Sequence, residues 1–306
     1  MIKLSIANTC LEIHANEIHK LNEFFGSEFA RRYIPSINVS ETCLGSTSAV
    51  IYWLKGEGFQ VLSSSYSNYG PDVYVVCGDL PRAYTNESPI FFLLQVLARG
   101  LAKAGLVLLT DTVAITTKSK SILLMGFPHT GKSTIATIAV NNGLTVRSTE
   151  NTVVKIKEKS LKLVGGTRVL VFDPKIKDLY GVKVEPTSKT KHGYEILDLD
   201  ALEPSSINKG EVGIDELYVI YTSFSAKGSS ISPIKGRKIE KLIWYFATSL
   251  IKGLDYYEPY PLNLPIDQPV AETLVKFVEI VKENYSNKFY EVFGSPLDVV
   301  KAILGV

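Results

Sequence analysis

The clearest chemical signal in the chain lies at residues 126–133, which read GFPHTGKS and match the pattern G-x-x-x-x-G-K-[ST]. The glycines of such a loop let successive backbone N–H groups curl around phosphate oxygens. The lysine places a cation on the β- and γ-phosphates, and the hydroxyl after it ligates Mg²⁺. We therefore predict a site for ATP and Mg²⁺ built from Gly126, His129, Thr130, Gly131, Lys132, Ser133 and Thr134.

The sequence on either side of this loop fits a phosphate-binding site. An apolar run at 122–125 predicts a buried strand before the loop. Apolar residues after it, Ile135, Ile138 and Ala139, recur at helical spacing until Gly143. A strand, a glycine loop and a helix in this order are the context that a phosphate-binding loop requires.

The composition predicts a well-packed protein without nucleic-acid or membrane partners. Apolar residues make up 45% of the 306 residues, and the net charge is +2. No run is rich in Lys and Arg, which argues against nucleic acid as a partner. The most apolar long stretch, 89–109, is interrupted by Gln95, Arg99 and Lys103, so we do not expect it to cross a membrane.

The three cysteines and the N-terminus suggest a cytoplasmic protein. Cys10, Cys43 and Cys77 are scattered without metal-binding spacing, so we expect buried free thiols in a reducing compartment. The N-terminal residues lack the basic segment and apolar core of a secretory signal. The oligomeric state stays open.

We predict two domains with a boundary after residue 87. Residues 1–87 are expected to form a small α+β domain with a helix at 18–32, strands at 49–54 and 73–77, and a solvated loop at 63–71. Residues 88–306 are expected to form an α/β domain whose mixed sheet carries the phosphate loop. A helix begins at Ser88-Pro89.

The second domain shows further patterned segments. They predict strands at 106–110, 113–116 and 216–221, a hairpin at 151–164, and helices at 238–252 and 269–283. The polar segment 178–211 is expected to be irregular and to cover the active site as a mobile segment. No internal repeat appears in the sequence.

Residues 88–306 resemble the HPr kinase/phosphorylase family, including its free serine and threonine kinase relatives, which shares a nucleotide fold with phosphoenolpyruvate carboxykinase. The resemblance rests on the LTDTVAI stretch at 109–115, the phosphate loop and the strand that ends in Ser148-Thr149-Glu150. The GGTR stretch at 165–168 and the KFYEVFGSP stretch at 288–296 are also similar. The resemblance implies a P-loop kinase domain that transfers phosphate from ATP to a hydroxyl group.

The chain departs from the family pattern at two positions. Asp111 stands where the family usually has His, and Thr149-Glu150 stands where it has a pair of Asp. Phosphoryl transfer needs Mg²⁺ and a carboxylate that orients the acceptor and takes its proton. We therefore assign Ser133 and Glu150 to the metal, Asp111 to the base, and Lys132 and Glu150 to catalysis. Arg168 is the candidate for an anionic group of the substrate.

A competing interpretation uses Asp173. It follows the apolar run 169–172, and in a conventional P-loop ATPase such an Asp would hold the Mg²⁺ water. The β-rich segment between Gly143 and Val169 is not the crossover helix that this interpretation requires.

The function expected from the sequence is ATP-dependent phosphorylation of a serine- or threonine-type hydroxyl. We favour a free amino acid, L-threonine or L-serine, as the acceptor. The alternatives are a protein-serine kinase acting on a small carrier protein, and a non-kinase ATPase or nucleotide switch that uses Asp173.

Overall fold

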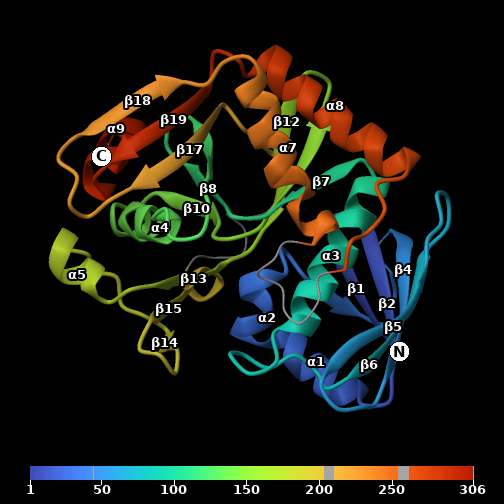
Figure 1. The fold of residues 1–306 in the computed structure, drawn as a ribbon. Helices are drawn as coiled ribbons and strands as arrows, with labels where there is room; N and C mark the ends of the chain where they lie inside the picture. Colours follow the sequence, from blue (N-terminus) through green and yellow to red (C-terminus); the bar gives the residue numbers. More distant parts are fainter. Residues whose placement is uncertain (44, 203–209, 254–261, 306) are drawn as a thin grey trace. The chain divides into compact units, whose positions relative to one another are not determined.

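The computed structural model describes residues 1–43, 45–202, 210–253 and 262–305 (Figure 1). It is a mixed α/β protein with several mixed sheets. The chain divides into two compact units. The first unit contains Met1–Leu108 and Ala247–Phe277, and the second contains Leu109–Phe246 and Val278–Val306.

The first unit is built on a six-stranded mixed sheet with the strand order β3-β1-β2-β4-β6-β5. Strand β2 is parallel to β4 and β4 is parallel to β6, whereas the other neighbours are antiparallel. The strands are β1 (Ile2–Ile6), β2 (Thr9–Ala15), β3 (Asn38–Ser40), β4 (Ser46–Leu54), β5 (Phe59–Ser65) and β6 (Asp72–Gly78).

Three helices of this unit accompany the sheet: α1 (Ile18–Gly26), α2 (Glu28–Tyr33) and α3 (Ser88–Lys103). The single helix expected at 18–32 is divided at Ser27, because the Ser27 hydroxyl accepts a hydrogen bond from the Ala30 N–H (3.2 Å) and caps a new helix. The serine-rich run expected as a loop at 63–71 begins inside the edge strand β5, which pairs with β6. Pairing with β6 makes residues 63–65 part of a strand, although their serines favour a turn.

Helix α3 belongs to the first unit, although the sequence placed it at the start of the second domain. Its buried side packs on β2 and β4 of the first sheet. A Cβ added to Gly100 would lie 2.5 Å from the Ser48 Oγ, so only glycine allows this close approach of helix and strand. The first unit therefore extends to Leu108 rather than ending at residue 87.

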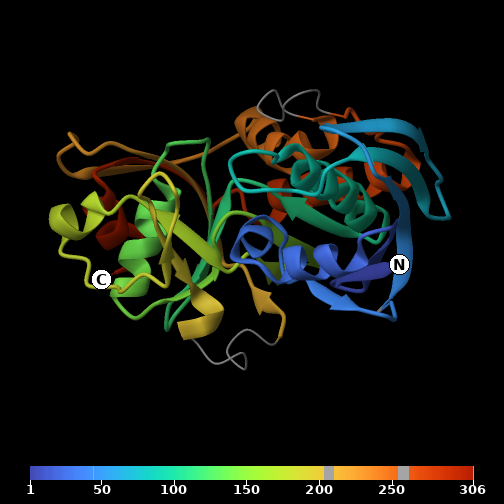
Figure 2. The same ribbon diagram turned by 90° about the horizontal axis from the view of Figure 1, so that it is seen from below.

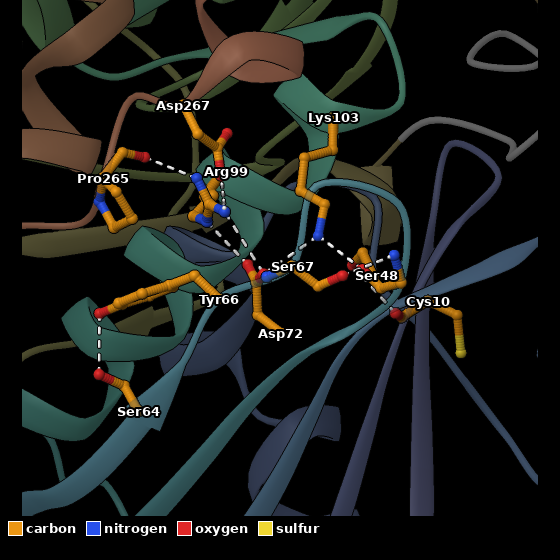
Figure 3. A network of polar contacts seen from close by, with 11 residues as sticks. Cys10, Ser48, Ser64, Tyr66, Ser67, Asp72, Arg99, Lys103, Pro265 and Asp267 are labelled. Atoms are coloured by element: carbon orange, nitrogen blue, oxygen red, sulfur yellow. Dashed lines mark hydrogen bonds and ion pairs between the residues drawn. The ribbon is translucent and has the colours of Figure 1, made fainter.

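A buried network of charges lies within the first unit (Figure 3). Arg99 of α3 has no exposed surface and pairs with Asp72 (2.8 Å) and Asp267 (2.6 Å), which lie on either side of it in Figure 3. The Lys103 ammonium group also contacts Asp72 (3.1 Å). Two cations and two carboxylates thus balance one another inside the protein, which is the condition under which charges can be buried.

The cysteine prediction is wrong for two of the three residues. Cys10 on β2 and Cys43 form a disulfide, with Cα atoms 5.7 Å apart. Cys77 is free and partly buried. The sheet brings the two residues together across 33 positions of sequence, and linear spacing does not reveal such a pairing.

The second unit contains another six-stranded mixed sheet, with the order β10-β8-β9-β17-β19-β18. Helices α4 (Lys132–Asn141) and α9 (Pro296–Leu304) pack against this sheet and against each other; in Figure 2 they are the green and red helices that lie together. The strands are β8 (Thr112–Thr116), β9 (Ser121–Met125), β10 (Thr145–Ser148), β17 (Glu216–Thr222), β18 (Ser229–Pro233) and β19 (Phe289–Gly294).

A long insertion separates β10 from β17. It forms β11 (Thr152–Lys157), β12 (Ser160–Gly166) and β16 (Val212–Gly213), and a separate three-stranded sheet of β13 (Val169–Phe172), β15 (Glu195–Asp198) and β14 (Ser188–Lys189). It also contains α5 (Lys175–Tyr180) and α6 (Leu199–Leu202). The prediction that 178–211 is irregular is therefore wrong for β14, β15 and α6, because β13 supplies a partner for β15. Residues 181–187 and 190–194 are irregular, as predicted. Residues 203–209 lie outside the described residues.

Three elements contain the boundaries between the units: β7 (Leu106–Leu109), α7 (Arg237–Lys252) and α8 (Gln268–Asn284). Both predicted C-terminal helices thus occur within a residue of their expected limits. Across the described ranges, none of the helices has the length and apolar character needed to cross a membrane.

The two six-stranded sheets have the same topology. If the six strands of each sheet are numbered in chain order, both sheets read 3-1-2-4-6-5. The directions also agree, because the second, fourth and sixth strands are mutually parallel in each sheet and the other pairs are antiparallel. The structure thus contains a repeat that the sequence does not show.

Candidate functional site

Three of the candidate residues, Asp111, Gly126 and Glu150, lie at the same end of neighbouring strands in the second sheet. Strands β9, β10 and β17 run in the same direction, and β8 runs in the opposite direction. The carboxyl ends of the first three strands therefore meet the amino end of β8. Gly126 follows β9, Glu150 lies two residues after β10, and Asp111 immediately precedes β8. Ligands commonly bind at the carboxyl ends of strands in such sheets.

The backbone of residues 126–131 makes a tight turn between β9 and α4. Gly131 has φ = 92° and caps the N-terminus of α4. A Cβ at Gly126 would lie 2.3 Å from the Thr130 Oγ1, so the loop closes tightly where its first glycine stands. The Thr130 N–H and hydroxyl both donate to the Phe127 carbonyl, at 3.2 and 2.8 Å. His129, also at positive φ, is exposed at the turn.

The Lys132 side chain folds back over this loop. Its ammonium group donates to the carbonyl oxygens of Gly126 (2.7 Å) and Phe127 (3.0 Å) and to the Asp111 carboxylate (3.0 Å). Lys132 is only 6% exposed and Asp111 only 5%. The structure therefore brings together the predicted catalytic base and the predicted phosphate-binding lysine, which are 21 residues apart in sequence.

Main-chain hydrogen bonds hold Asp111 in this position. Its carbonyl accepts from the Gly126 N–H (3.2 Å), and the next residue, Thr112, donates to the Glu150 carbonyl (2.9 Å). Asp111 has φ = 57°, in the left-handed region that Asp tolerates better than most residues. The turn at Asp111 is thereby hydrogen-bonded to Gly126 of the loop on one side and, through Thr112, to Glu150 on the other.

The predicted metal ligands are Ser133, in the first turn of α4, and Glu150; both are partly buried. The Thr167 hydroxyl fixes the Glu150 backbone by accepting from the N–H groups of Glu150 (2.9 Å) and Asn151 (3.0 Å). Within the described residues, no three His, Cys, Asp or Glu side chains form a metal cluster. A Mg²⁺ ion bound to nucleotide phosphates needs one or two protein carboxylates, and the donor set of Ser133 and Glu150 fits it chemically.

Arg168, predicted to contact an anionic group of the substrate, makes hydrogen bonds to other parts of the protein. Its side chain is 7% exposed and donates to Asp200 (3.1 Å) and to the carbonyl oxygens of Val146 and Leu199. None of these partners is a predicted site residue. In this arrangement the guanidinium ties β10 to the residues after β15 rather than presenting donors to a substrate.

Asp173 does not follow a strand of the sheet that carries the loop. It follows β13, which belongs to the three-stranded sheet, and its carboxylate accepts from the Lys175 N–H (2.9 Å) at the start of α5. The parallel neighbour of β9 is β17, which ends at Thr222.

An aromatic cluster borders the loop. The Phe127 ring lies 5.0 Å from Tyr245 and 5.5 Å from Phe246 of α7, measured between ring centroids. Burial, and next the negative charge of Asp111, raise the pKa of Tyr245 above its ordinary value.

Sequence inspection did not single out Thr167, Thr222 or Tyr245 as site residues. Thr167 lies within the GGTR stretch noted for its resemblance, and Thr222 directly follows the predicted strand 216–221. Thr167 contacts Glu150, and Thr222 contacts the loop residue Thr130. These contacts depend on strand order, for which the local sequence carries no signal.

No protein-family profile matches this chain, and no curated protein sequence is significantly similar to it.

Proposed function

We propose that the protein is an ATP-dependent kinase that phosphorylates a serine- or threonine-type hydroxyl, most readily that of free L-threonine or L-serine. The observation that carries this proposal is the buried contact of 3.0 Å between Lys132, at the end of the phosphate loop, and Asp111. A carboxylate held beside the cation that binds the γ-phosphate is suited to act as a base for an attacking hydroxyl.

The topology around the loop adds support. The strand before the loop, β9, forms an antiparallel hairpin with β8 on one side and pairs in parallel with β17 on the other. This mixed arrangement agrees with the resemblance to the HPr kinase/phosphorylase family and its phosphoenolpyruvate carboxykinase-type fold. In that interpretation Glu150 lies where the family pattern has an acidic pair.

The proposed reaction uses the described side chains in distinct roles. Loop N–H groups and Lys132 bind the phosphates, while Ser133 and Glu150 hold the Mg²⁺ ion that neutralises their charge. The Asp111 carboxylate accepts the proton of the acceptor hydroxyl. The acceptor oxygen bonds to the γ-phosphorus as the bond from that phosphorus to the β–γ bridging oxygen breaks, which yields a phosphate ester and ADP.

Nucleotide binding would also free the base. The Lys132 ammonium group is shared between Asp111 and two loop carbonyl oxygens. The β- and γ-phosphates offer a stronger anionic partner for the same ammonium group. The Asp111 carboxylate then becomes available to the acceptor hydroxyl when the donor is in place.

The switch or ATPase alternative has less support, because Asp173 follows a strand of another sheet and its carboxylate accepts a hydrogen bond from the Lys175 N–H at the start of α5. The choice between a free amino acid and a carrier protein concerns the same reaction at the same site. The acceptor is therefore an outcome of the experiment below.

³¹P NMR of the protein with MgATP and pooled hydroxy amino acids tests the proposal. We expect a new phosphate-ester resonance that appears together with ADP, and its loss in Lys132→Ala. A matched control is Lys120→Ala, since Lys120 lies at the opposite end of β9 and pairs with Glu216. ADP and inorganic phosphate without any ester would indicate an ATPase, and an ester only with a serine-containing carrier protein would assign the acceptor to a protein.

A further inference from the structure

Thr222, on the neighbouring strand β17, makes two hydrogen bonds to the phosphate loop. Its N–H (3.0 Å) and its hydroxyl (2.8 Å) both donate to a single acceptor, the Thr130 carbonyl oxygen. The contact arises from strand register, because Val219 of β17 pairs with Met125 at the end of β9, and β17 continues for three more residues. Those residues run alongside the loop.

These two hydrogen bonds fix the orientation of the peptide between Thr130 and Gly131, and therefore the direction of the Gly131 N–H. The Thr130 carbonyl and the Gly131 N–H belong to one planar trans peptide, so they point in opposite directions. When the carbonyl is held toward Thr222, the Gly131 N–H is turned away from β17. N–H groups directed inward are what such a loop uses to bind phosphate.

The fit between Thr222 and Gly131 is too close for any other residue at 131. A Cβ added to Gly131 would lie 1.9 Å from the Thr222 Oγ1. The second glycine of the loop is therefore required by this contact as well as by its φ of 92°. The two residues act as a matched pair.

We propose that Thr222 is a positioning residue that sets the phosphate-binding conformation of the loop through the Thr130 carbonyl. This inference rests on the proposed nucleotide site, but it does not depend on the identity of the acceptor or on catalysis. The hydroxyl is the part that mutation can remove, since the N–H belongs to the backbone.

Isothermal titration with MgADP tests this role. Thr222→Val and Thr222→Ala should each raise the Kd by roughly three- to tenfold, the effect of one lost hydrogen bond. Thr222→Ser keeps the hydroxyl and should restore the Kd of the unmodified protein. The control is Thr116→Val. This change removes a hydroxyl that hydrogen-bonds Ser121 in the β8–β9 hairpin, at the end of β9 that lies opposite the loop.

The thermal midpoints of all four variants separate positioning from folding. Positioning predicts that Thr116→Val and Thr222→Val lower the midpoint similarly while only the latter weakens MgADP binding. Unchanged binding in both Thr222→Val and Thr222→Ala would overturn the inference and leave the proposed kinase intact. Binding without phosphoryl transfer would instead overturn the kinase alone.

A second observation is independent of Thr222. The two sheets share strand order and directions, and in each unit a helix follows the second strand and another follows the sixth. In both units, a helix of the connection after the second strand contacts the helix after the sixth strand: α2 contacts α3, and α4 contacts α9. In the first unit, α1 precedes α2 in the same connection.

The connection after the second strand differs between the units. In the second unit it is the six-residue loop 126–131, whereas in the first unit only Asn16 and Glu17 separate β2 from α1. Two residues cannot surround a phosphate group. Glu17 also places a carboxylate at the start of α1, where Lys20 pairs with it (2.8 Å), and a carboxylate there opposes the binding of a phosphate anion.

We infer that the first unit is a second copy of the nucleotide-binding module from which the phosphate loop is absent, so that the chain binds one nucleotide. The inference rests on nucleotide binding by the second unit. Titration with a non-hydrolysable MgATP analogue should give one site per chain, and Lys132→Ala should remove it. The control, Lys20→Ala in the first unit, should leave both affinity and stoichiometry unchanged.

Two sites per chain, or a site that survives in folded Lys132→Ala protein, would overturn this inference without affecting the acceptor chemistry. A chain that binds no nucleotide would overturn both inferences together with the proposed kinase.

Discussion

The Lys132 ammonium group lies 3.0 Å from the Asp111 carboxylate, and both side chains are almost fully buried. The same ammonium group bonds two carbonyl oxygens of the loop that precedes it. Lys132 is thus held by groups that a nucleotide must replace or share. This contact leads to the first prediction.

Asp111→Asn should separate phosphoryl transfer from nucleotide binding. Loss of the base should lower the transfer rate at saturating Mg²⁺ by about 10² or more. Nucleotide should bind as well as before or several-fold more tightly, because a negative charge that competes for Lys132 is gone. Single-turnover kinetics and titration with a non-hydrolysable ATP analogue measure the two effects. Recovery of the rate at high Mg²⁺ would identify Asp111 as a metal ligand, and an unchanged rate would leave it only a turn residue.

Glu150 and Asp173 should respond very differently to loss of charge. Glu150→Gln should abolish Mg²⁺-dependent turnover, because an oxygen ligand loses its charge beside the loop. Asp173→Asn should have little effect, since Asn can still accept the hydrogen bond from the Lys175 N–H that Asp173 accepts now. Steady-state rates across a Mg²⁺ titration measure both variants. The reverse ranking would favour the conventional ATPase mechanism.

Arg99→Met should destabilise the protein by about 3–5 kcal/mol, the usual effect of leaving buried charges without their partner. The charges left behind would be those of Asp72 and Asp267. Urea denaturation measures the loss, and the exposed Arg82→Met serves as a control expected to change stability by less than about 0.5 kcal/mol. A loss as small as that of the control would show that the network contributes little.

Cys43→Ser should lower stability by about 3 kcal/mol, because the disulfide with Cys10 closes a long segment in the unfolded chain. Cys77→Ser, which removes the free thiol, is the matched control. Denaturation curves with and without reductant should converge for Cys43→Ser and differ for Cys77→Ser. Alkylation of three thiols in unreduced protein would contradict the pairing.

The local features of the site could be predicted from the amino-acid pattern. The glycine spacing and the flanking apolar runs specified the strand 121–125, the loop and α4, because these depend on short-range geometry and helical or strand periodicity. The long helices α7 and α8 followed from their amphipathic pattern for the same reason. Lys132 and Ser133 could be named because their positions are fixed within the motif.

Long-range relationships were decided by the tertiary structure. Three contacts join strands or loops whose adjacency depends on sheet order. They are the Asp111–Lys132 ion pair, the hydrogen bonds from Thr222 to Thr130, and the Cys10–Cys43 disulfide. The same holds for the segment 178–211, where a partner strand converted a polar stretch into part of a sheet. Strand order depends on which apolar faces pack best in the whole chain, and no local pattern encodes that choice. The repeated topology of the two units was hidden for this reason, since different residues can satisfy the same pattern of strand pairing.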